Sequence, residues 1–240
     1  MIFVTSSGKS AIEDHFDRQP CLEQLLERKG RADLAALVRG VSRGLSILSV
    51  RQPEPLGLGH AVLMARDAVG DEPFAVILPD ELVFGDEPAL AQCLAIANRT
   101  DSPVIGLVRV PREHASRYGM VDADERGDGT VVVHDLVEKP EPADSPSDLA
   151  ISGPYVLVPE VFDVLASSRP GRVGEIQLTD ALRALTDGER PLIGCLIEGE
   201  RLDVGQPLGF LQANVAFALA QPELGAALRA WLEERLARGG

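Results

Sequence analysis

The sequence is poor in basic residues, and this scarcity excludes two classes of partner. Its 240 residues include 23 Lys and Arg against 37 Asp and Glu, so the formal net charge at pH 7 is −14. Proteins that bind nucleic acid polymers or anionic membranes present clustered basic side chains. We therefore expect no nucleic acid polymer and no membrane as a partner, whereas a small anionic ligand needs only a few local cations.

Cysteines and long apolar runs are also scarce. The three cysteines, Cys21, Cys93 and Cys195, are scattered and show no zinc-type spacing, which indicates a reduced, cytoplasmic protein. The chain has no run of about 18 apolar residues and does not begin with a basic region followed by an apolar run. The sequence therefore predicts neither a membrane span nor a signal peptide.

What the sequence does contain is an alternation of strand-like and helical patterns, which predicts an α/β domain with a mostly parallel sheet. Residues 101–158 are richer in strands, so part of the sheet is expected to be antiparallel. The Pro-rich stretch 141–147 is a domain linker or a surface loop, and we favour the loop because a strand pattern resumes at Leu149. Strands are expected at Ile2–Thr5, Ser46–Arg51, Phe74–Leu78, Val104–Val110, Val131–Glu138, Tyr155–Val158 and Leu192–Ile197. Helices are expected at Leu22–Arg39, His60–Val69, Ala89–Thr100, Pro159–Ala166, Gln177–Thr186 and Leu224–Leu236.

The opening segment IFVTSSGKS has the outline of a phosphate-binding P-loop. A P-loop requires a second glycine five residues before the Gly of Gly-Lys-Ser, and that position is Phe3. We therefore reject the P-loop. The alternative is that Ser7 or Ser10 caps a helix whose first turn carries Glu13 and Asp14, which suits the helix dipole.

Two stretches place candidate ligand-binding residues after strands. In VRQPEPLGLGHA (50–61), glycines would let a flat ligand approach the backbone, although this stretch taken alone favours a plain βα turn. In AVILPDE (75–81), an expected buried strand ends at Asp80, where a carboxylate suits Mg²⁺. Asp80 could instead cap the next turn. Asp203 is a possible second ligand, but the spacing does not show that the two carboxylates meet.

Two further stretches carry charged residues. In LVEKP (136–140), Glu138 and Lys139 are neighbours in a strand and would point to opposite faces, where they could contact different parts of one ligand. A solvated strand end is the alternative. GEIQLTD (174–180) has the composition of a helix start. The histidines are isolated, and no Ser/His/Asp arrangement indicates a hydrolase.

In order and spacing, these stretches resemble the bacterial UTP–glucose-1-phosphate uridylyltransferases (UDP-glucose pyrophosphorylases). The resemblance covers nearly the whole chain and rests on VTSSGKSAIEDHFD, VRQPEPLGLGHAVL, FAVILPDEL, YGMVD, LVEKP, SDLAISGPYVL and GEIQLTDAL. It implies a three-layer Rossmann-like mixed sheet of the nucleotide-diphospho-sugar transferase type. It also implies one catalytic domain over residues 1–240, ending in helices at about 208–237, in a cytoplasmic homo-oligomer.

The resemblance further implies the chemistry. The phosphate of glucose 1-phosphate would attack the α-phosphorus of UTP, so that UDP-glucose forms and pyrophosphate leaves, with Mg²⁺ as cofactor. Residues matching the family's site are Asp80 and Asp203 for the metal, Gln52 and Gly59 for uracil, Gly119, Glu138 and Gly153 for the sugar, Lys139 for the sugar phosphate, and Glu175 near the sugar. Asp80 and Lys139 would be the catalytic pair.

One departure from the family pattern concerns the start of the chain. Family members begin with a strand and a Gly-x-Gly-Thr-Arg loop that wraps the triphosphate, whereas Met1 falls at the start of the family's second βα unit. We therefore expect the first βα unit to be missing, two strand edges to be left unpaired, and this chain to synthesise little UDP-glucose. The alternatives are a sequence that lacks its true N-terminus, an inactive paralogue or fragment that binds sugar nucleotide or pairs with a full-length subunit, and an unrelated nucleotide-binding protein.

Overall fold

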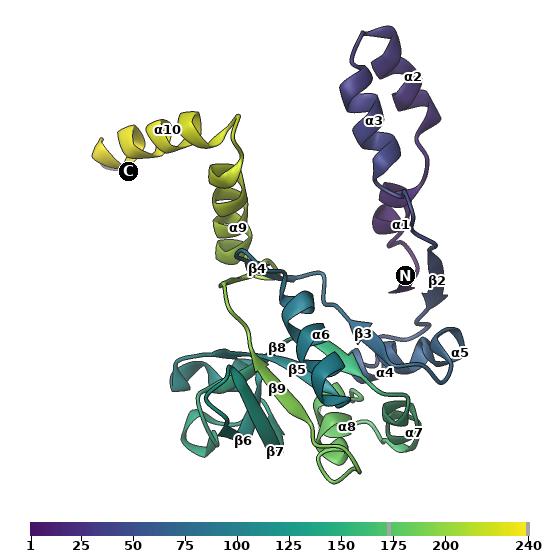
Figure 1. Ribbon diagram of the computed structural model, residues 1–240, viewed down its shortest axis with the longest axis vertical. Coiled ribbons are helices and arrows are strands. Elements are labelled where there is room, and N and C mark those ends of the chain that lie inside the picture. The colour runs from purple at the N-terminus through teal and green to yellow at the C-terminus, as the bar shows by residue number, and fades with distance from the viewer. Residues whose placement is uncertain (172–173, 239–240) are drawn as a thin grey trace. The chain divides into compact units, whose positions relative to one another are not determined.

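The computed structural model describes residues 1–171 and 174–238, which fall into two compact units. The first unit combines residues 1–71 with 162–178, and the second combines 72–161 with 179–240. Figure 1 shows the elements of both. In the described residues, no helix is long and apolar enough to cross a membrane.

The first unit is built on two parallel strands, β1 (Ile2–Thr5) and β2 (Leu48–Arg51). Parallel neighbours need a long crossover connection, and here it contains three helices, α1 (Ala11–Phe16), α2 (Pro20–Arg28) and α3 (Ala32–Gly40). Glu13 and Asp14 do lie in the first turn of α1, but Ser10 makes no side-chain cap to the backbone. After β2 come α4 (Leu58–Met64) and α5 (Arg66–Val69), and α7 (Glu160–Ser167) lies largely in this unit.

The single helix expected over residues 22–39 is wrong, because the segment forms the hairpin of α2 and α3. Gly30 has a φ of +71° directly after the last residues of α2, a left-handed conformation that commonly ends helices. Glu23 joins the two helices. Its carboxylate accepts hydrogen bonds from Arg18 Nε at 2.8 Å and from Arg39 Nε at 2.8 Å.

The Glu23 carboxylate makes the hairpin sensitive to pH. Hydrogen bonds from Arg18 and Arg39 lower the pKa of Glu23 from 4.5 to about 2. The folded pKa lies below the unfolded one, so its stabilising effect is complete above pH 4.5 and is lost as the pH falls through about 2. We expect Glu23→Gln to lower the melting temperature at pH 7, and the gap to wild type to close between pH 4.5 and 2. Circular dichroism at 222 nm would follow thermal unfolding, and Glu54→Gln, which changes an exposed glutamate, is the control. A difference in melting temperature that stays constant between pH 4.5 and 2 would contradict the prediction.

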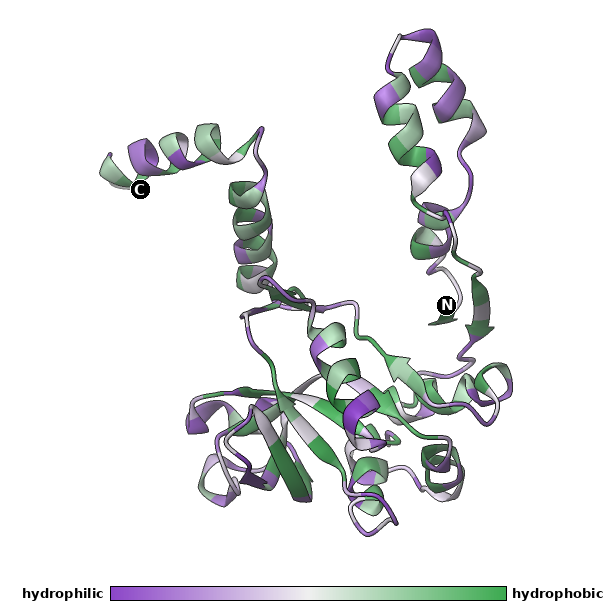
Figure 2. Cartoon of the chain, viewed as in Figure 1, coloured by the Kyte–Doolittle hydropathy of each residue, from purple (hydrophilic) through white to green (hydrophobic). Residues whose placement is uncertain are grey.

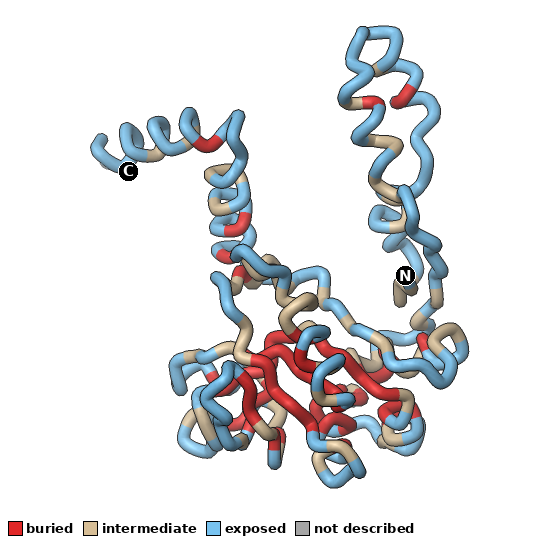
Figure 3. The backbone as a smooth tube through the Cα atoms, in the orientation of Figure 1, coloured by how far each residue is buried: buried red, intermediate tan, exposed pale blue. Residues whose placement is uncertain are grey.

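The second unit contains a six-stranded sheet in the order β3-β8-β5-β9-β7-β6. Its buried strands form the core that Figure 3 shows, and helix α6 (Ala89–Thr100) packs against β5, β8 and β9. The strands are β3 (Phe74–Val76), β5 (Val104–Arg109), β6 (Gly119–Glu125), β7 (Thr130–Glu138), β8 (Leu149–Leu157) and β9 (Ile193–Leu196). A separate antiparallel pair joins β4 (Glu81–Phe84) to β10 (Glu200–Asp203), and the remaining helices are α8 (Leu178–Leu185), α9 (Pro207–Ala220) and α10 (Gly225–Ala237).

The sheet is mixed, and the expectation that it is mostly parallel is wrong for this unit. In the six-stranded order, β5 pairs with β9 in parallel, whereas β8 runs antiparallel between β3 and β5, and β7 runs antiparallel to β6 and β9. The antiparallel strands come from the region 101–158, as expected. The strand at Phe74 is also shorter and more exposed than expected, with Ile77 62% exposed. Among the described residues, β3 pairs with β8 alone, so one of its edges lies open.

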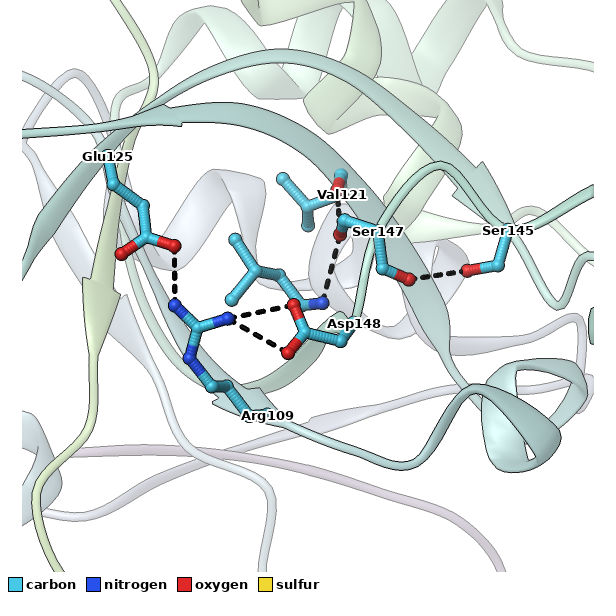
Figure 4. A network of polar contacts seen from close by, with 7 residues as sticks. Arg109, Val121, Glu125, Ser145, Ser147 and Asp148 are labelled. Atoms are coloured by element: carbon cyan, nitrogen blue, oxygen red, sulfur yellow. Dashed lines mark hydrogen bonds and ion pairs between the residues drawn. The ribbon is translucent and has the colours of Figure 1, made fainter.

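The Pro-rich stretch 141–147 is a loop inside the second unit and not a linker between units. A polar network fixes its end (Figure 4): Arg109 binds both carboxylate oxygens of Asp148 at 2.8 and 2.9 Å and also contacts Glu125. Ser147 donates to the carbonyl of Val121 at 2.5 Å. The network ties the loop to β5 and β6.

Candidate active site

The antiparallel pairing of β4 with β10 brings together the two aspartates that the sequence could not connect. Asp203 pairs with Glu81 in the register, so Asp80, one residue before β4, lies opposite the segment that follows β10. The Val204 N–H donates to the Asp80 carbonyl at 2.8 Å. Asp80 and Asp203 therefore meet at one end of this strand pair.

Gly205 shows how closely the two carboxylates converge. A Cβ atom at Gly205 would stand 3.2 Å from Asp203 Oδ1 and 3.2 Å from Asp80 Oδ2. The Gly205 N–H also donates to Asp203 Oδ1 at 3.1 Å.

The described residues contain no cluster of three His, Cys, Asp or Glu side chains able to hold a metal. Mg²⁺ is commonly bound by one or two carboxylates together with substrate phosphates, so this pair fits that ion.

An ion pair between an arginine and a glutamate joins β10 to β4 next to the Asp80 and Asp203 carboxylates. Arg201 Nε donates to Glu81 Oε2 at 2.6 Å, its second nitrogen contacts Glu81 Oε1, and the side chains are 16% and 19% exposed. Burial raises the pKa of the Glu81 carboxyl, and the ion pair with Arg201 opposes that rise. Arg201 also lies 5.0 Å above the ring of Tyr118. This pair links β10 to β4 beside Asp80 and Asp203.

A second group of candidate residues lies close together where β6 meets β7. Gly119 pairs with Glu138 in the register. A Cβ atom at Gly119 would stand 3.0 Å from Ile151 Cδ1, 3.1 Å from Thr179 Oγ1 and 3.2 Å from Glu138 Oε2, so a side chain at this position would press against all three. Thr179 donates to Glu138 Oε2 at 2.6 Å and holds the carboxylate in place.

Lys139 does not follow the alternation expected for a strand. Its φ is +45°, and its Nζ lies 3.6 Å from Glu138 Oε1, on the side of its neighbour. The left-handed conformation turns the chain out of β7 at this residue, which is why the side chains do not point to opposite faces. The Lys139 N–H donates to the Tyr118 carbonyl at 3.0 Å. Gly153, with a φ of +70°, lies two residues along β8 from Ile151.

The candidate uracil residues and Glu175 lie in the first unit. Gln52 Nε2 donates to the Gly57 carbonyl at 3.1 Å and lies 3.1 Å from His60 Nδ1, so its amide is held against the Gly-rich loop. The Gly59 N–H donates to the Ile176 carbonyl at 2.9 Å. A Cβ atom at Gly57 would stand 2.9 Å from Glu175 Cβ. The GEIQLTD segment therefore packs on the Gly-rich loop, and the backbone N–H of Gly59 is already engaged there.

Comparison with known proteins identifies the family of this chain. A family model described as "Nucleotidyl transferase" matches residues 8–219, which is most of the chain. The chain belongs to the nucleotidyl transferase family. Its Rossmann-like mixed α/β fold also agrees with that of "UTP-bound UGPase from acinetobacter baumannii", with a TM-score of 0.89 and 36% identity over 97% of this chain and 81% of that one.

Individual relatives within the family share a large part of their sequence with this nucleotidyl transferase. It is 42% identical to a UTP–glucose-1-phosphate uridylyltransferase of Staphylococcus epidermidis over 98% of this chain and 81% of the relative. It is 44% identical to the Bacillus subtilis protein of the same name over 93% of this chain and 76% of the relative. The resemblance inferred from the motifs is confirmed, and the unrelated nucleotide-binding alternative is excluded.

Sequence reasoning missed three residues that the nucleotidyl transferase fold brings to the site. Thr179 lies in GEIQLTD, which has the composition of a helix start, and its bond to Glu138 depends on the fold. Arg201 precedes Asp203 by two residues in β10. Since alternate residues of a strand share a face, a strand assignment at ERLD would have linked them. Tyr118 directly precedes Gly119. Its carbonyl accepts a hydrogen bond from the backbone N–H of Lys139, the residue after Glu138.

Proposed function

We propose that this nucleotidyl transferase makes UDP-glucose and pyrophosphate from UTP and glucose 1-phosphate with Mg²⁺, and that residues 1–240 act as one catalytic domain. The observation that carries the proposal is the convergence of Asp80 and Asp203, in the same unit as Glu138 and Lys139. The names of the relatives and of the UTP-bound neighbour support the choice of substrates. Since the attacking phosphate is already an anion, the protein has to align two phosphate groups and neutralise their charge.

Each candidate residue has a role that its surroundings support. Asp80 and Asp203 would hold Mg²⁺, which supplies positive charge to the reacting phosphates. Glu138, whose carboxylate accepts a hydrogen bond from Thr179, would in turn accept hydrogen bonds from sugar hydroxyls near Gly119. Lys139 would offer its ammonium to the sugar phosphate.

The candidate uracil residues belong to the first unit. Gln52 would read the base edge with its side-chain amide. Because the Gly59 N–H is bound to Ile176, Gly59 would act by letting the loop pack closely, since a Cβ there would stand 2.7 Å from the Ile176 carbonyl oxygen. Glu175 would support this loop through its contact with Gly57, and Gly153 would shape the wall of the sugar pocket near Ile151.

Two measurements on the purified chain test the proposed function. Calorimetry with UDP-glucose tests binding, with GDP-glucose as the control for base recognition. A coupled pyrophosphate-release assay with UTP, glucose 1-phosphate and Mg²⁺ tests turnover. Binding without pyrophosphate release would favour the non-catalytic alternative, and the absence of both would overturn the proposal.

We also propose that the C-terminal helices associate with a second copy of the chain. Helix α9 carries no charged residue, and Leu208, Phe210 and Leu211 are 67%, 55% and 62% exposed; Figure 2 shows its apolar character. A groove of about 640 Å³ lies beside it. Residues 207–240 hold three Glu and three Arg, so this segment is neutral in a chain of net charge −14. Two copies can therefore meet here without the repulsion that acts elsewhere on their surfaces. The groove is lined by Phe84, Glu200, Leu211, Gln212, Val215, Ala216, Leu219, Ala220 and Arg229.

Size-exclusion chromatography with light scattering tests this association. We expect Leu211→Asp to convert the wild-type oligomer to a monomer at micromolar concentration, because it places a charge in an apolar interface. The control is Leu37→Asp, which changes a residue of the first unit that is 68% exposed. A monomeric wild type, or an oligomer that survives Leu211→Asp, would contradict the proposal.

A further inference from the structure

Arg117 is a cation beside the carboxylate pair that the site described above leaves unused. It ends the short 3-10 helix η1 (Arg112–Arg117) and directly precedes Tyr118. Its Nη2 lies 4.0 Å from Asp203 Oδ2, its guanidinium carbon lies 5.8 Å from the Tyr118 ring centroid, and its side chain is 47% exposed. Arg117 therefore reaches the edge of the metal-binding carboxylates from the solvent side.

Arg201 provides an internal comparison, because it approaches the same two partners. Its Nη2 lies 3.9 Å from Asp203 Oδ2, and it lies over the same Tyr118 ring. However, Arg201 is engaged by Glu81 and by the Tyr118 hydroxyl at 3.3 Å. A guanidinium has five N–H donors, and a 4.0 Å contact is too long to be a hydrogen bond. Within residues 1–171 and 174–238, the guanidinium of Arg117 makes no hydrogen bond to the protein, so its donors face solvent.

The backbone places Arg117 between the two halves of the candidate site in the second unit. Gly119 faces Glu138 across the β6–β7 ladder, and the Tyr118 carbonyl accepts the N–H of Lys139. Arg117, one residue earlier, reaches Asp203. Three consecutive residues thus run from the sugar pocket, past the phosphate-binding lysine, to the metal-binding aspartate.

Charge balance explains why a cation is needed at this position. The four carboxylates Asp80, Glu81, Glu138 and Asp203 line this part of the unit, and Arg201 is paired with Glu81 while Lys139 lies 3.6 Å from Glu138. A ligand with two phosphates brings further negative charge into the same place. Arginine suits phosphate because its planar donors can bind two oxygens at once.

We propose that Arg117 binds a phosphate group of the substrate next to the Asp80–Asp203 metal site. The inference rests on the proposed function, since it takes a sugar nucleotide or sugar phosphate as the ligand. On binding, the guanidinium exchanges its long contact with Asp203 for direct hydrogen bonds to phosphate oxygens.

The test compares three variants by calorimetry with UDP-glucose in the presence of Mg²⁺. Arg117→Gln is expected to weaken binding by roughly tenfold to a hundredfold, as for a lost hydrogen bond between charged groups. Arg117→Lys is expected to recover part of the loss, because it restores the charge without the planar fork. Arg126→Gln, in the exposed turn between β6 and β7, removes the same charge at a distance and is expected to bind like wild type.

A probe without phosphate separates phosphate binding from a structural role. Uridine, followed by NMR titration, is expected to bind wild type and Arg117→Gln equally, and their melting temperatures are expected to agree. If Arg117→Gln and Arg126→Gln bind UDP-glucose alike, or if uridine binding falls in parallel, the inference is wrong while the proposed function stands. If wild type binds neither UDP-glucose nor glucose 1-phosphate, the proposed function itself fails, and this inference fails with it.

Discussion

In a protein that also carries the strand and Gly-x-Gly-Thr-Arg loop with which family members begin, Asp80→Asn is expected to lower Mg²⁺-dependent UDP-glucose synthesis by at least about 100-fold. The reason is the charge of the site: Asp80 Oδ2 and Asp203 Oδ1 face the same space beside Gly205, and together they supply the two negative charges that a divalent cation needs. An amide keeps the shape of the side chain but removes one of those charges. A metal that neutralises charge on a transferring phosphoryl group contributes several kcal/mol to the transition state, and each 1.36 kcal/mol is a factor of ten in rate.

Metal binding itself can be measured without turnover. We expect calorimetric titration of Mg²⁺ in the presence of UDP-glucose to show weaker binding for both Asp80→Asn and Asp203→Asn, and the double variant to be little worse than either single one, since both act on one ion. Asp86→Asn changes an exposed aspartate of the same unit and serves as the control. Wild-type metal affinity in Asp80→Asn, or independent losses that multiply in the double variant, would show that the two carboxylates do not share a metal.

The sequence predicted most elements whose residues are uniformly apolar. Val104–Arg109 and Ile193–Leu196 lie within a residue or two of their expected bounds, because buried strands read as continuous hydrophobic runs. Thr130–Glu138 was also predicted, from its run of three valines, whereas only the end of the apolar strand β8 was. The strands that were missed, β4, β6 and β10, mix apolar with charged residues. Their stability comes from pairing with a partner distant in sequence, which a local pattern does not record.

The candidate site shows the same division. The motifs identified Asp80 and Asp203 separately, but their meeting depends on the β4–β10 register, which pairs residues about 120 positions apart. Lys139 was assigned to a regular strand, and its left-handed backbone conformation left no signal, because it is neither glycine nor asparagine. Residue types at strand ends were therefore predictable, whereas the partners that orient them were not.

The second large effect is expected at the proposed sugar-binding residue Glu138. Glu138→Ala is expected to weaken UDP-glucose binding by roughly tenfold to a hundredfold, because it removes a charged acceptor that would bind sugar hydroxyls. Binding of UDP, which lacks the sugar, is expected to stay at the wild-type level. Equal losses for UDP and UDP-glucose would place Glu138 outside the sugar pocket.

Substitution of Thr179 tests whether the orientation of the Glu138 carboxylate matters for UDP-glucose binding, in addition to its presence. Its hydroxyl donates to Glu138 Oε2 at 2.6 Å, and both groups stand within 3.2 Å of the position that a Cβ of Gly119 would take. If Thr179 acts by fixing the carboxylate, Thr179→Val should weaken UDP-glucose binding in the wild-type background and change nothing once Glu138 is alanine, since neighbouring residues in one hydrogen-bond network are not additive. Thr186→Val removes a hydroxyl that donates to the Arg183 carbonyl just after α8, and it should leave affinity unchanged. A loss of UDP-glucose affinity from Thr179→Val that persists in the Glu138→Ala background would contradict this role. It would mean that Thr179 affects sugar binding without acting through the Glu138 carboxylate.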